Sequence, residues 1–187
     1  MEQKMKVINL WGGPGIGKST TAAGLFYAMK QQQLNVELVT EYAKDAVWER
    51  RQNLFDDQIY IFAKQQRRIA RLKGHGIDWI ITDSPIPTGL IYTNLKEYGP
   101  SFPNLVIEVF NQYTNYNFLL SRNWKYNPIG RNQKNEDEAT VFDRKVESLL
   151  NAWQLDFKHI TAGEIAVDHI MHNVVNSQLD QQLDLGL

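Results

Sequence analysis

The chain has 187 residues, no cysteine and a formal net charge of -1 at pH 7. The near-neutral charge gives no global reason to expect binding to nucleic acid or to a membrane surface, and the lack of cysteine excludes disulfides and thiolate metal sites. No apolar leader or bilayer-spanning run stands out, so we expect one cytoplasmic domain over residues 1–187 without membrane contact, and a homodimer stays open. The Gln- and Asp-rich residues 177–187 are expected to form a flexible tail.

A glycine-rich run near the start of the chain fits the phosphate-binding pattern G-x-x-x-x-G-K-[ST]. Its glycines let the backbone approach a phosphate closely, and successive N–H groups can then form an anion-binding nest. We expect Lys18 to reach the β- and γ-phosphates of ATP, and the Ser19 hydroxyl to bind Mg²⁺. The predicted ATP-binding residues of this run are Gly13, Pro14, Gly15, Ile16, Gly17, Lys18, Ser19 and Thr20.

Short apolar runs alternate with helical patterns along the whole chain, which predicts an α/β fold with a parallel sheet and helices on both faces. The glycine-rich run lies between an expected strand and an expected helix, which is the context that this motif requires. Strands are expected at 6–11, 35–40, 79–82, 116–120 and 157–161, and helices at 20–30, 42–51, 55–73, 88–95, 104–114, 139–154 and 164–178.

Two carboxylates follow expected strands directly, Glu41 after the second and Asp83 after the third. The ligand crevice of an open α/β sheet lies at the carboxyl ends of its strands, so we expect both beside the glycine-rich run. An apolar strand that ends in Asp is the Walker B pattern, which makes Asp83 a candidate Mg²⁺ ligand together with Ser19. The plainer explanations are a helix-start carboxylate for Glu41 and an Asx turn before Pro85 for Asp83.

A long polar segment after the fourth expected strand, at about residues 122–137, is a candidate lid. It contains Arg122, Lys125, Arg131 and Lys134, with Pro and Gly in its middle. Four cations in a segment that leaves the carboxyl end of a strand favour a mobile lid over a phosphate site, although an ordinary surface loop is the alternative.

These motifs resemble the P-loop nucleoside and nucleotide kinases, above all the deoxynucleoside kinase and nicotinamide riboside kinase branch with its phage-encoded members. The resemblance covers roughly residues 6–175. It implies a P-loop NTPase three-layer sandwich with strand order 2-3-1-4-5 and a lid. It also implies ATP and Mg²⁺ as cofactors, and transfer of the γ-phosphoryl to a hydroxyl of a small nucleoside- or nucleotide-like acceptor.

The resemblance also implies roles for single residues. Glu41 would accept a hydrogen bond from the acceptor hydroxyl, and Ala162, in the loop after the fifth strand, would pack on the adenine. The compact double-arginine lid of ordinary nucleoside monophosphate kinases is not found, which argues against a monophosphate acceptor. Candidate catalytic residues are Lys18, Glu41, Asp83, Arg122 and Arg131, and candidate acceptor-binding residues are Glu41, Tyr42, Gln58 and Phe62, with Gln65 and Trp48 nearby.

Three other P-loop functions are alternatives to this one. A regulatory GTPase needs Asp-x-x-Gly after the third strand and Asn-Lys-x-Asp later, and the chain has neither. A P-loop ATPase that couples hydrolysis to a partner stays open, although no Glu follows Asp83. A kinase that acts on hydroxymethylated bases in DNA would use the basic run 64–73 as a phosphate-contacting face, and the net charge argues mildly against nucleic acid.

Overall fold

The computed structural model describes residues 4–129 and 135–179, and the sheet within them is parallel with strand order β2-β3-β1-β4-β5. The predicted fold class and strand order are therefore confirmed. The central strand β1 pairs with β3 on one side and with β4 on the other. The strands are β1 (Lys6–Trp11), β2 (Val36–Val39), β3 (Trp79–Thr82), β4 (Thr114–Ser121) and β5 (Lys158–Thr161).

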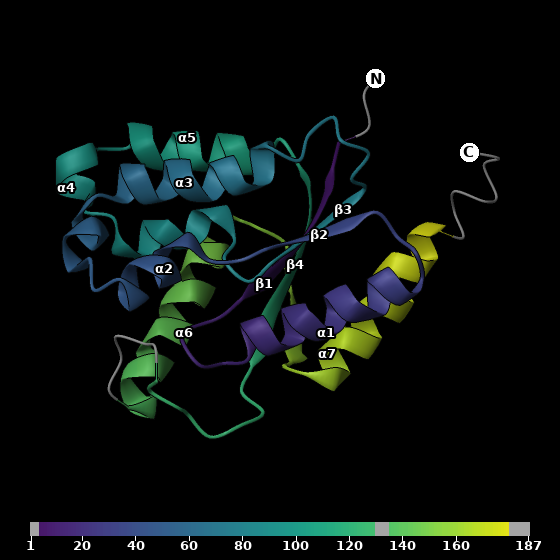
Figure 1. The fold of residues 1–187 in the computed structure, drawn as a ribbon. Helices are drawn as coiled ribbons and strands as arrows, with labels where there is room; N and C mark the ends of the chain where they lie inside the picture. The colour runs from purple at the N-terminus through teal and green to yellow at the C-terminus, as the bar shows by residue number, and fades with distance from the viewer. Residues whose placement is uncertain (1–3, 130–134, 180–187) are drawn as a thin grey trace.

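Two helices cover one face of the sheet, as Figure 1 shows. They are α1 (Lys18–Gln31) and α7 (Glu164–Ile170), and a π-helical stretch (Met171–Asn176) continues α7. Leu25 of α1 and Ile170 of α7 are fully buried in the core that these helices share with the sheet. Burial of these apolar side chains fixes α1, and with it the loop that precedes α1.

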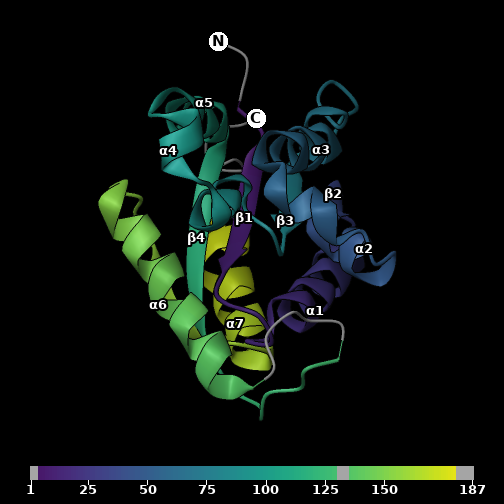
Figure 2. The same ribbon diagram turned by 90° about the vertical axis from the view of Figure 1, so that its left-hand side faces the viewer.

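Three further helices cover the other face, which Figure 2 shows from a second direction. They are α3 (Gln58–Ala70), α5 (Ser101–Phe110) and α6 (Glu136–Ala152). Their core includes Trp11 and Phe110, whose rings meet edge to face with centroids 6.1 Å apart. The shorter elements are α2 (Tyr42–Trp48), α4 (Leu95–Tyr98) and 3-10 helices at Gln52–Asp56 and Ile86–Tyr92.

The helix predicted over 55–73 is two elements, a 3-10 turn followed by α3. The break comes at Asp57, whose side chain accepts a hydrogen bond from the Tyr60 N–H at 2.9 Å and so caps a new helix. The helix predicted over 88–95 is likewise two elements, a 3-10 helix with Pro near its start and then α4, which are separated by the extended residue Thr93. Each difference follows from a local cap or a proline that apolar periodicity does not register.

Two of the other boundaries that differ from expectation have a clear local cause. Residues 101–103, expected in a loop, form the first turn of α5, where the missing N–H of Pro103 leaves no helical hydrogen bond unmade. The last residues of the predicted lid, 136–137, begin α6, because the Asn135 side chain accepts from the Glu138 N–H at 2.9 Å and caps that helix. Within the described residues, no helix combines the length and the apolar character needed to cross a bilayer.

The register of the sheet brings three strand ends together. Thr82 of β3 lies beside Val39 of β2 and beside Asn9 of β1. Because all three strands are parallel, the residues that follow them emerge at one edge of the sheet. Glu41, Asp83 and the glycine-rich run are therefore neighbours at that edge.

Candidate functional site

The glycine-rich run forms a loop between β1, which is buried along its length, and α1, which begins at Lys18. Gly17 caps the helix at φ 110° and Gly12 opens the loop at φ 143°, two conformations that side chains disfavour. The first N–H groups of a helix have no partner within the helix. The start of α1 therefore offers backbone donors to a phosphate.

The Lys18 ammonium lies on this loop, where its Nζ donates to the carbonyl oxygens of Gly12 (2.7 Å) and Gly13 (2.9 Å). Burial lowers the pKa of Lys18, and nearby carboxylates, Glu41 first among them, oppose that effect. In this position Lys18 can exchange two carbonyl oxygens for the β- and γ-phosphate oxygens of a nucleotide.

Asp83 follows β3 and is 5% exposed. Its Oδ2 accepts a hydrogen bond from the Ser19 hydroxyl at 2.6 Å, and its Oδ1 accepts one from the Glu41 N–H at 3.1 Å. Mg²⁺ favours such hard oxygen donors and usually completes its shell with phosphates and water. Ser19 and Asp83 supply two such oxygens side by side, which fits a metal that is shared with a nucleotide. Within residues 4–129 and 135–179, no group of three or more His, Cys, Asp or Glu side chains could hold a metal.

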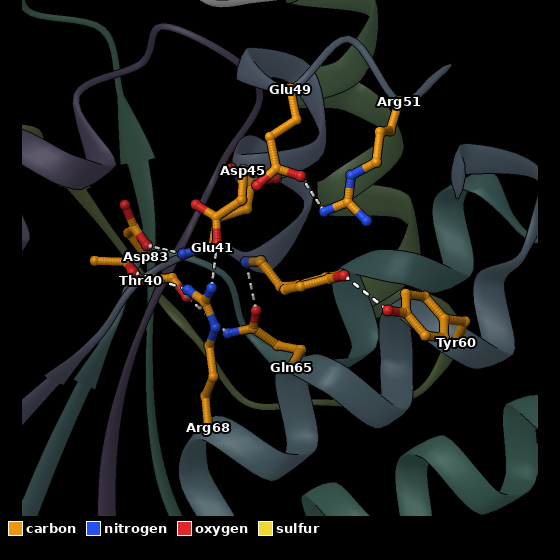
Figure 3. Close-up of polar contacts among 10 residues, drawn as sticks. Thr40, Glu41, Asp45, Glu49, Arg51, Tyr60, Gln65, Arg68 and Asp83 are labelled. Atoms are coloured by element: carbon orange, nitrogen blue, oxygen red, sulfur yellow. Dashed lines mark hydrogen bonds and ion pairs between the residues drawn. The ribbon is translucent and has the colours of Figure 1, made fainter. Parts of the chain in front are cut away.

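Glu41 lies at the corner where β2 leads into α2, and side chains of α3 bind the residues on either side of it in the sequence (Figure 3). The Tyr42 N–H donates to Gln65 Oε1 at 2.8 Å, while Gln65 Nε2 donates to the Thr40 carbonyl at 3.3 Å. Arg68 Nη1 donates to the same carbonyl at 3.1 Å and its Nη2 pairs with a carboxylate of α2. Gln65 and Arg68 thus hold the backbone that positions Glu41. The sequence did not indicate this role for them.

The Glu41 carboxylate lies in a poorly solvated position. Burial raises the pKa of Glu41, the Lys18 ammonium opposes this rise, and the Asp83 carboxylate adds to it. A carboxylate with a raised pKa is a better proton acceptor near neutral pH than an ordinary one.

A cavity of about 410 Å³ extends from the phosphate loop into a pocket of aromatic and apolar side chains. Glu41 and Asp83 both line it. Tyr92 and Phe142 stack beside it with ring centroids 5.4 Å apart and an interplanar angle of 30°. The other pocket residues include Val47, Trp48, Phe55, Gln58, Ile61, Thr88, Ile91 and Val146.

The residues predicted to bind the acceptor fall into two groups. Gln58 lines the cavity with Glu41, whereas Tyr42 and Phe62 do not. Tyr42 is buried and its hydroxyl donates to the Tyr60 hydroxyl at 3.2 Å. Phe62 packs edge to face on Phe102, with centroids 5.7 Å apart, in the core beneath α3. The pocket side of α3 is therefore the side of Gln58, and Phe62 lies on the core side.

The residues predicted to bind ATP line the cavity with two exceptions, Ile16 and Ala162. Both are buried, at 3% and 0% exposure. The Trp124 indole covers this region, because a β-carbon on Gly17 or Gly163 would come within 2.7 or 2.6 Å of its ring. Trp124 lines the cavity and is 47% exposed, so it offers an aromatic face beside the phosphate loop in place of Ala162. An aromatic residue in the polar segment is the signal that could have identified it.

The first residues of the predicted lid contact the site directly. The Arg122 guanidinium donates to the Pro14 carbonyl at 3.0 Å and pairs with Asp143 at 2.9 Å. Asn123 Nδ2 donates to the Ala162 carbonyl at 3.3 Å. Arg122 therefore lies on the phosphate loop and does not line the cavity. Arg131 and Lys134 lie outside the described residues.

Sequence reasoning also missed Thr88, Phe142 and Asp143. Thr88 and Phe142 reach the cavity because the 3-10 segment that follows β3 packs against α6. That contact, which includes the stacked rings of Tyr92 and Phe142, joins segments far apart in the sequence, and nothing local in the sequence indicates it.

A phosphate loop between β1 and α1, a Walker B aspartate after β3 and a 2-3-1-4-5 parallel sheet together define a P-loop nucleotide-binding protein. The chain belongs to a family of AAA domains, whose profile matches residues 7–166. No curated protein matches the sequence significantly.

Solved structures of kinases and related proteins share this fold. A crystal structure of the NadR protein in complex with NAD and AMP-PNP is similar at 18% identity with a TM-score of 0.62 over 91% of this chain, which spans 50% of that protein's length. Deoxyadenosine kinase from M. mycoides with bound dATP is similar at 16% identity and a TM-score of 0.51, over 91% of this chain and 98% of that one. The resemblance to P-loop nucleoside kinases is thus confirmed at the level of the fold.

Proposed function

We propose that the protein is an ATP- and Mg²⁺-dependent phosphotransferase that moves the γ-phosphoryl of ATP to a hydroxyl of a small nucleoside- or nucleotide-like acceptor. The observation that supports this most directly is the continuous cavity that joins the phosphate loop to an aromatic pocket, with Glu41 in its wall. An enzyme that only hydrolyses ATP has no need of a second organic pocket beside its candidate base.

The lining of the pocket fits a flat heteroaromatic ring. Tyr92 and Phe142 provide a stacked aromatic wall. Gln58 Nε2 donates to the Phe55 carbonyl at 2.7 Å, which leaves Gln58 Oε1 buried without a partner in the described structure. Thr88 Oγ1 is also buried without a partner there. Buried polar atoms of this kind usually find hydrogen bonds, and ring nitrogens or exocyclic amines of an acceptor would supply them.

The transfer follows from the arrangement of the chain's own residues. The acceptor oxygen forms a bond to the γ-phosphorus, the bond from that phosphorus to the β–γ bridging oxygen breaks, and ADP leaves. Glu41 takes the hydroxyl proton, while Lys18 and the start of α1 hold the phosphates. Ser19 and Asp83 would hold Mg²⁺, which neutralises phosphate charge when bound.

We also propose that residues 122–135, the part of the predicted lid that precedes α6, form a lid, in which Arg131 neutralises charge on the transferring phosphoryl. Closure would exclude the water that otherwise hydrolyses ATP. The single domain over 1–187, the cytoplasmic location and a homodimer remain predictions.

The proposal is tested by incubating the protein with Mg²⁺, γ-labelled ATP and a panel of nucleosides, nucleoside monophosphates, nicotinamide riboside and hydroxymethylated DNA. Label in a small acceptor supports the proposal, and label in the DNA favours the polymer kinase instead. Brisk ATP hydrolysis with no labelled acceptor contradicts the proposal and favours the ATPase. Lys18→Ala should impair both ATP binding and phosphoryl transfer, because we expect Lys18 to contact the phosphates of ATP in both steps.

A further inference from the structure

An aspartate of α6, Asp143, contacts the phosphate loop directly. Its Oδ1 accepts a hydrogen bond from the Gly13 N–H at 2.7 Å, and its Oδ2 accepts one from Arg122 Nη2 at 2.9 Å. Arg122 donates in turn through Nη1 to the carbonyl oxygen of Pro14 at 3.0 Å. A carboxylate and a guanidinium therefore hold adjacent residues of the loop, one at an N–H group and the other at a C=O group.

The position of Asp143 on its helix is unusual for a carboxylate. Ala139, Val146 and Leu150 of α6 are buried, and Asp143 falls between them at the same helical spacing. Aspartate in such an apolar stripe is uncommon unless it has partners. The Asp143 and Arg122 side chains are only 23% and 13% exposed, so their contact is much less screened than a surface ion pair.

Gly13 is adapted to this contact. A β-carbon at Gly13 would lie 2.4 Å from Asp143 Oδ1 and 2.9 Å from the Ala139 carbonyl oxygen, so any larger residue would displace the helix or the carboxylate. The carbonyl of Gly13 accepts from Lys18 Nζ at 2.9 Å. Both backbone polar groups of Gly13 are thus bound, the N–H by Asp143 and the C=O by the lysine of the phosphate-binding motif.

We propose that Asp143 is a positioning residue, which together with Arg122 holds the Gly13–Pro14 segment in the conformation that admits a triphosphate. Asp143 acts through the loop and need not touch the nucleotide. Arg122 then contributes to nucleotide binding by bracing the loop. The inference rests on one part of the proposed function, the binding of ATP at this loop, and on no particular acceptor.

The first test compares Asp143→Asn with Glu147→Gln, the same loss of charge one turn further along α6. Glu147 is half exposed and contacts only His159 among the described ionisable side chains, at 3.4 Å. Gly13 N–H and Arg122 bind different oxygens of Asp143, and asparagine replaces one of these oxygens with an NH2 donor, so one of the two contacts is lost. We expect Asp143→Asn to raise the Kd for a Mg²⁺-bound, non-hydrolysable ATP analogue about tenfold, and Glu147→Gln to leave it unchanged.

The Tm without ligand separates positioning from a purely structural role. If Asp143 had a purely structural role, Asp143→Asn would lower the Tm. The Kd for the ATP analogue, measured well below the Tm, would then be unchanged. That result overturns the inference. Asparagine matches aspartate in size, so Asp143→Asn keeps the test available if Asp143→Ala does not fold.

A double-mutant cycle with Arg122→Met and Asp143→Ala tests whether the two residues act together. If they brace the loop as one unit, the double variant should bind the analogue within about threefold of Arg122→Met alone. A Kd that rises by the product of the two single effects would show independent roles and overturn the inference. If the unmodified protein does not bind the analogue at all, the proposed function fails before any variant is compared.

Discussion

The backbone N–H of Glu41 donates to Asp83 Oδ1 at 3.1 Å, while Asp83 Oδ2 accepts from the Ser19 hydroxyl at 2.6 Å. The candidate base and the candidate metal ligands are therefore linked through one carboxylate. The link joins the ends of β2 and β3 to the first turn of α1. A shift of any of these elements would move the base and the metal site together, so transfer should be sensitive to contacts that lie outside the cavity.

Glu41→Gln should depress phosphoryl transfer about 10²- to 10⁴-fold, the usual contribution of a positioned general base. The Kd for ATP should change little, because the backbone N–H contact to Asp83 does not need the Glu41 side chain. Glu49→Gln is the matched control. Glu49 is an exposed carboxylate just after α2 that pairs with Arg51, so its substitution should leave the rate of transfer unchanged. Transfer that is unchanged in Glu41→Gln would show that the base has been misassigned.

The raised pKa of Glu41 predicts how stability depends on pH. In the folded state this carboxyl keeps its proton at pH values where the unfolded chain, with an ordinary Glu pKa of about 4.3, has released it. The free energy of unfolding should therefore fall as the pH rises from about 4 through the folded-state pKa of Glu41. Glu41→Gln lacks this loss, so its stability relative to the unmodified protein should increase over the same pH range.

Denaturant unfolding at a series of pH values measures this difference. The curve for Glu49→Gln should run parallel to that of the unmodified protein, because Glu49 is an exposed carboxylate outside the cavity. A constant difference between Glu41→Gln and the unmodified protein across the range would contradict the raised pKa.

The sequence predicted those parts of the site that depend on local motifs and on strand ends. Lys18 and Ser19 belong to a contiguous pattern, and a P-loop can be recognised from that pattern with its flanking strand and helix. Glu41 and Asp83 were found because parallel strands end at one edge, so their neighbourhood follows from topology alone. The register of β2, β3 and β1 confirms that neighbourhood.

The sequence did not predict contacts that depend on how a helix is rotated. Gln58 and Phe62 lie one turn apart on α3, yet the first lines the cavity and the second packs on Phe102. Gln65 was expected near the acceptor and instead holds the Glu41 corner. The rotation of α3 is set by burial against α5 and the sheet, which single-sequence periodicity does not resolve to one residue.

Gln65→Met should lower transfer because it releases the corner that positions Glu41. The substitution leaves the Tyr42 N–H without its 2.8 Å partner, and an unpaired buried donor costs about 1–3 kcal/mol of stability. Gln66→Met is the control, since the Gln66 side chain reaches Tyr113 and not this corner. We expect kcat to fall for Gln65→Met while the Kd for ATP stays the same. Equal kcat values for the two variants would show that Gln65 does not position Glu41.

Asp83→Asn should raise the Mg²⁺ concentration needed for half-maximal transfer by at least about tenfold. Even the loss of a residue that only contacts a metal ligand weakens metal binding by about this factor. The neutral amide is a weaker ligand than the carboxylate that contacts Ser19. Asp78→Asn, just before the other end of β3, is the control, because Asp78 contacts Asn35 at the opposite edge of the sheet. An unchanged Mg²⁺ titration for Asp83→Asn would remove Asp83 from the metal site.

Trp124 should contribute to the binding of the nucleotide base. Its indole rests on Gly17 and Gly163 and presents a partly exposed face to the cavity, next to the phosphate loop. Loss of an aromatic platform costs about 1–3 kcal/mol per stacked base. Trp124→Ala should therefore bind ATP more weakly than the unmodified protein does. Its affinity for tripolyphosphate, which has no base, should be unchanged. Trp48→Ala, on the acceptor side of the same cavity, should leave both affinities unchanged.

Fluorescence distinguishes stacking from a general disturbance of the loop. ATP should quench the emission of the unmodified protein, and the quenching should be lost in Trp124→Phe, which keeps an aromatic ring but not the indole. Trp48 also lines the cavity, so the part of the quenching that disappears in Trp124→Phe, and not the total, measures the contact with Trp124. If Trp124→Ala weakens tripolyphosphate as much as ATP, the indole supports the fold of the phosphate loop and does not bind the base.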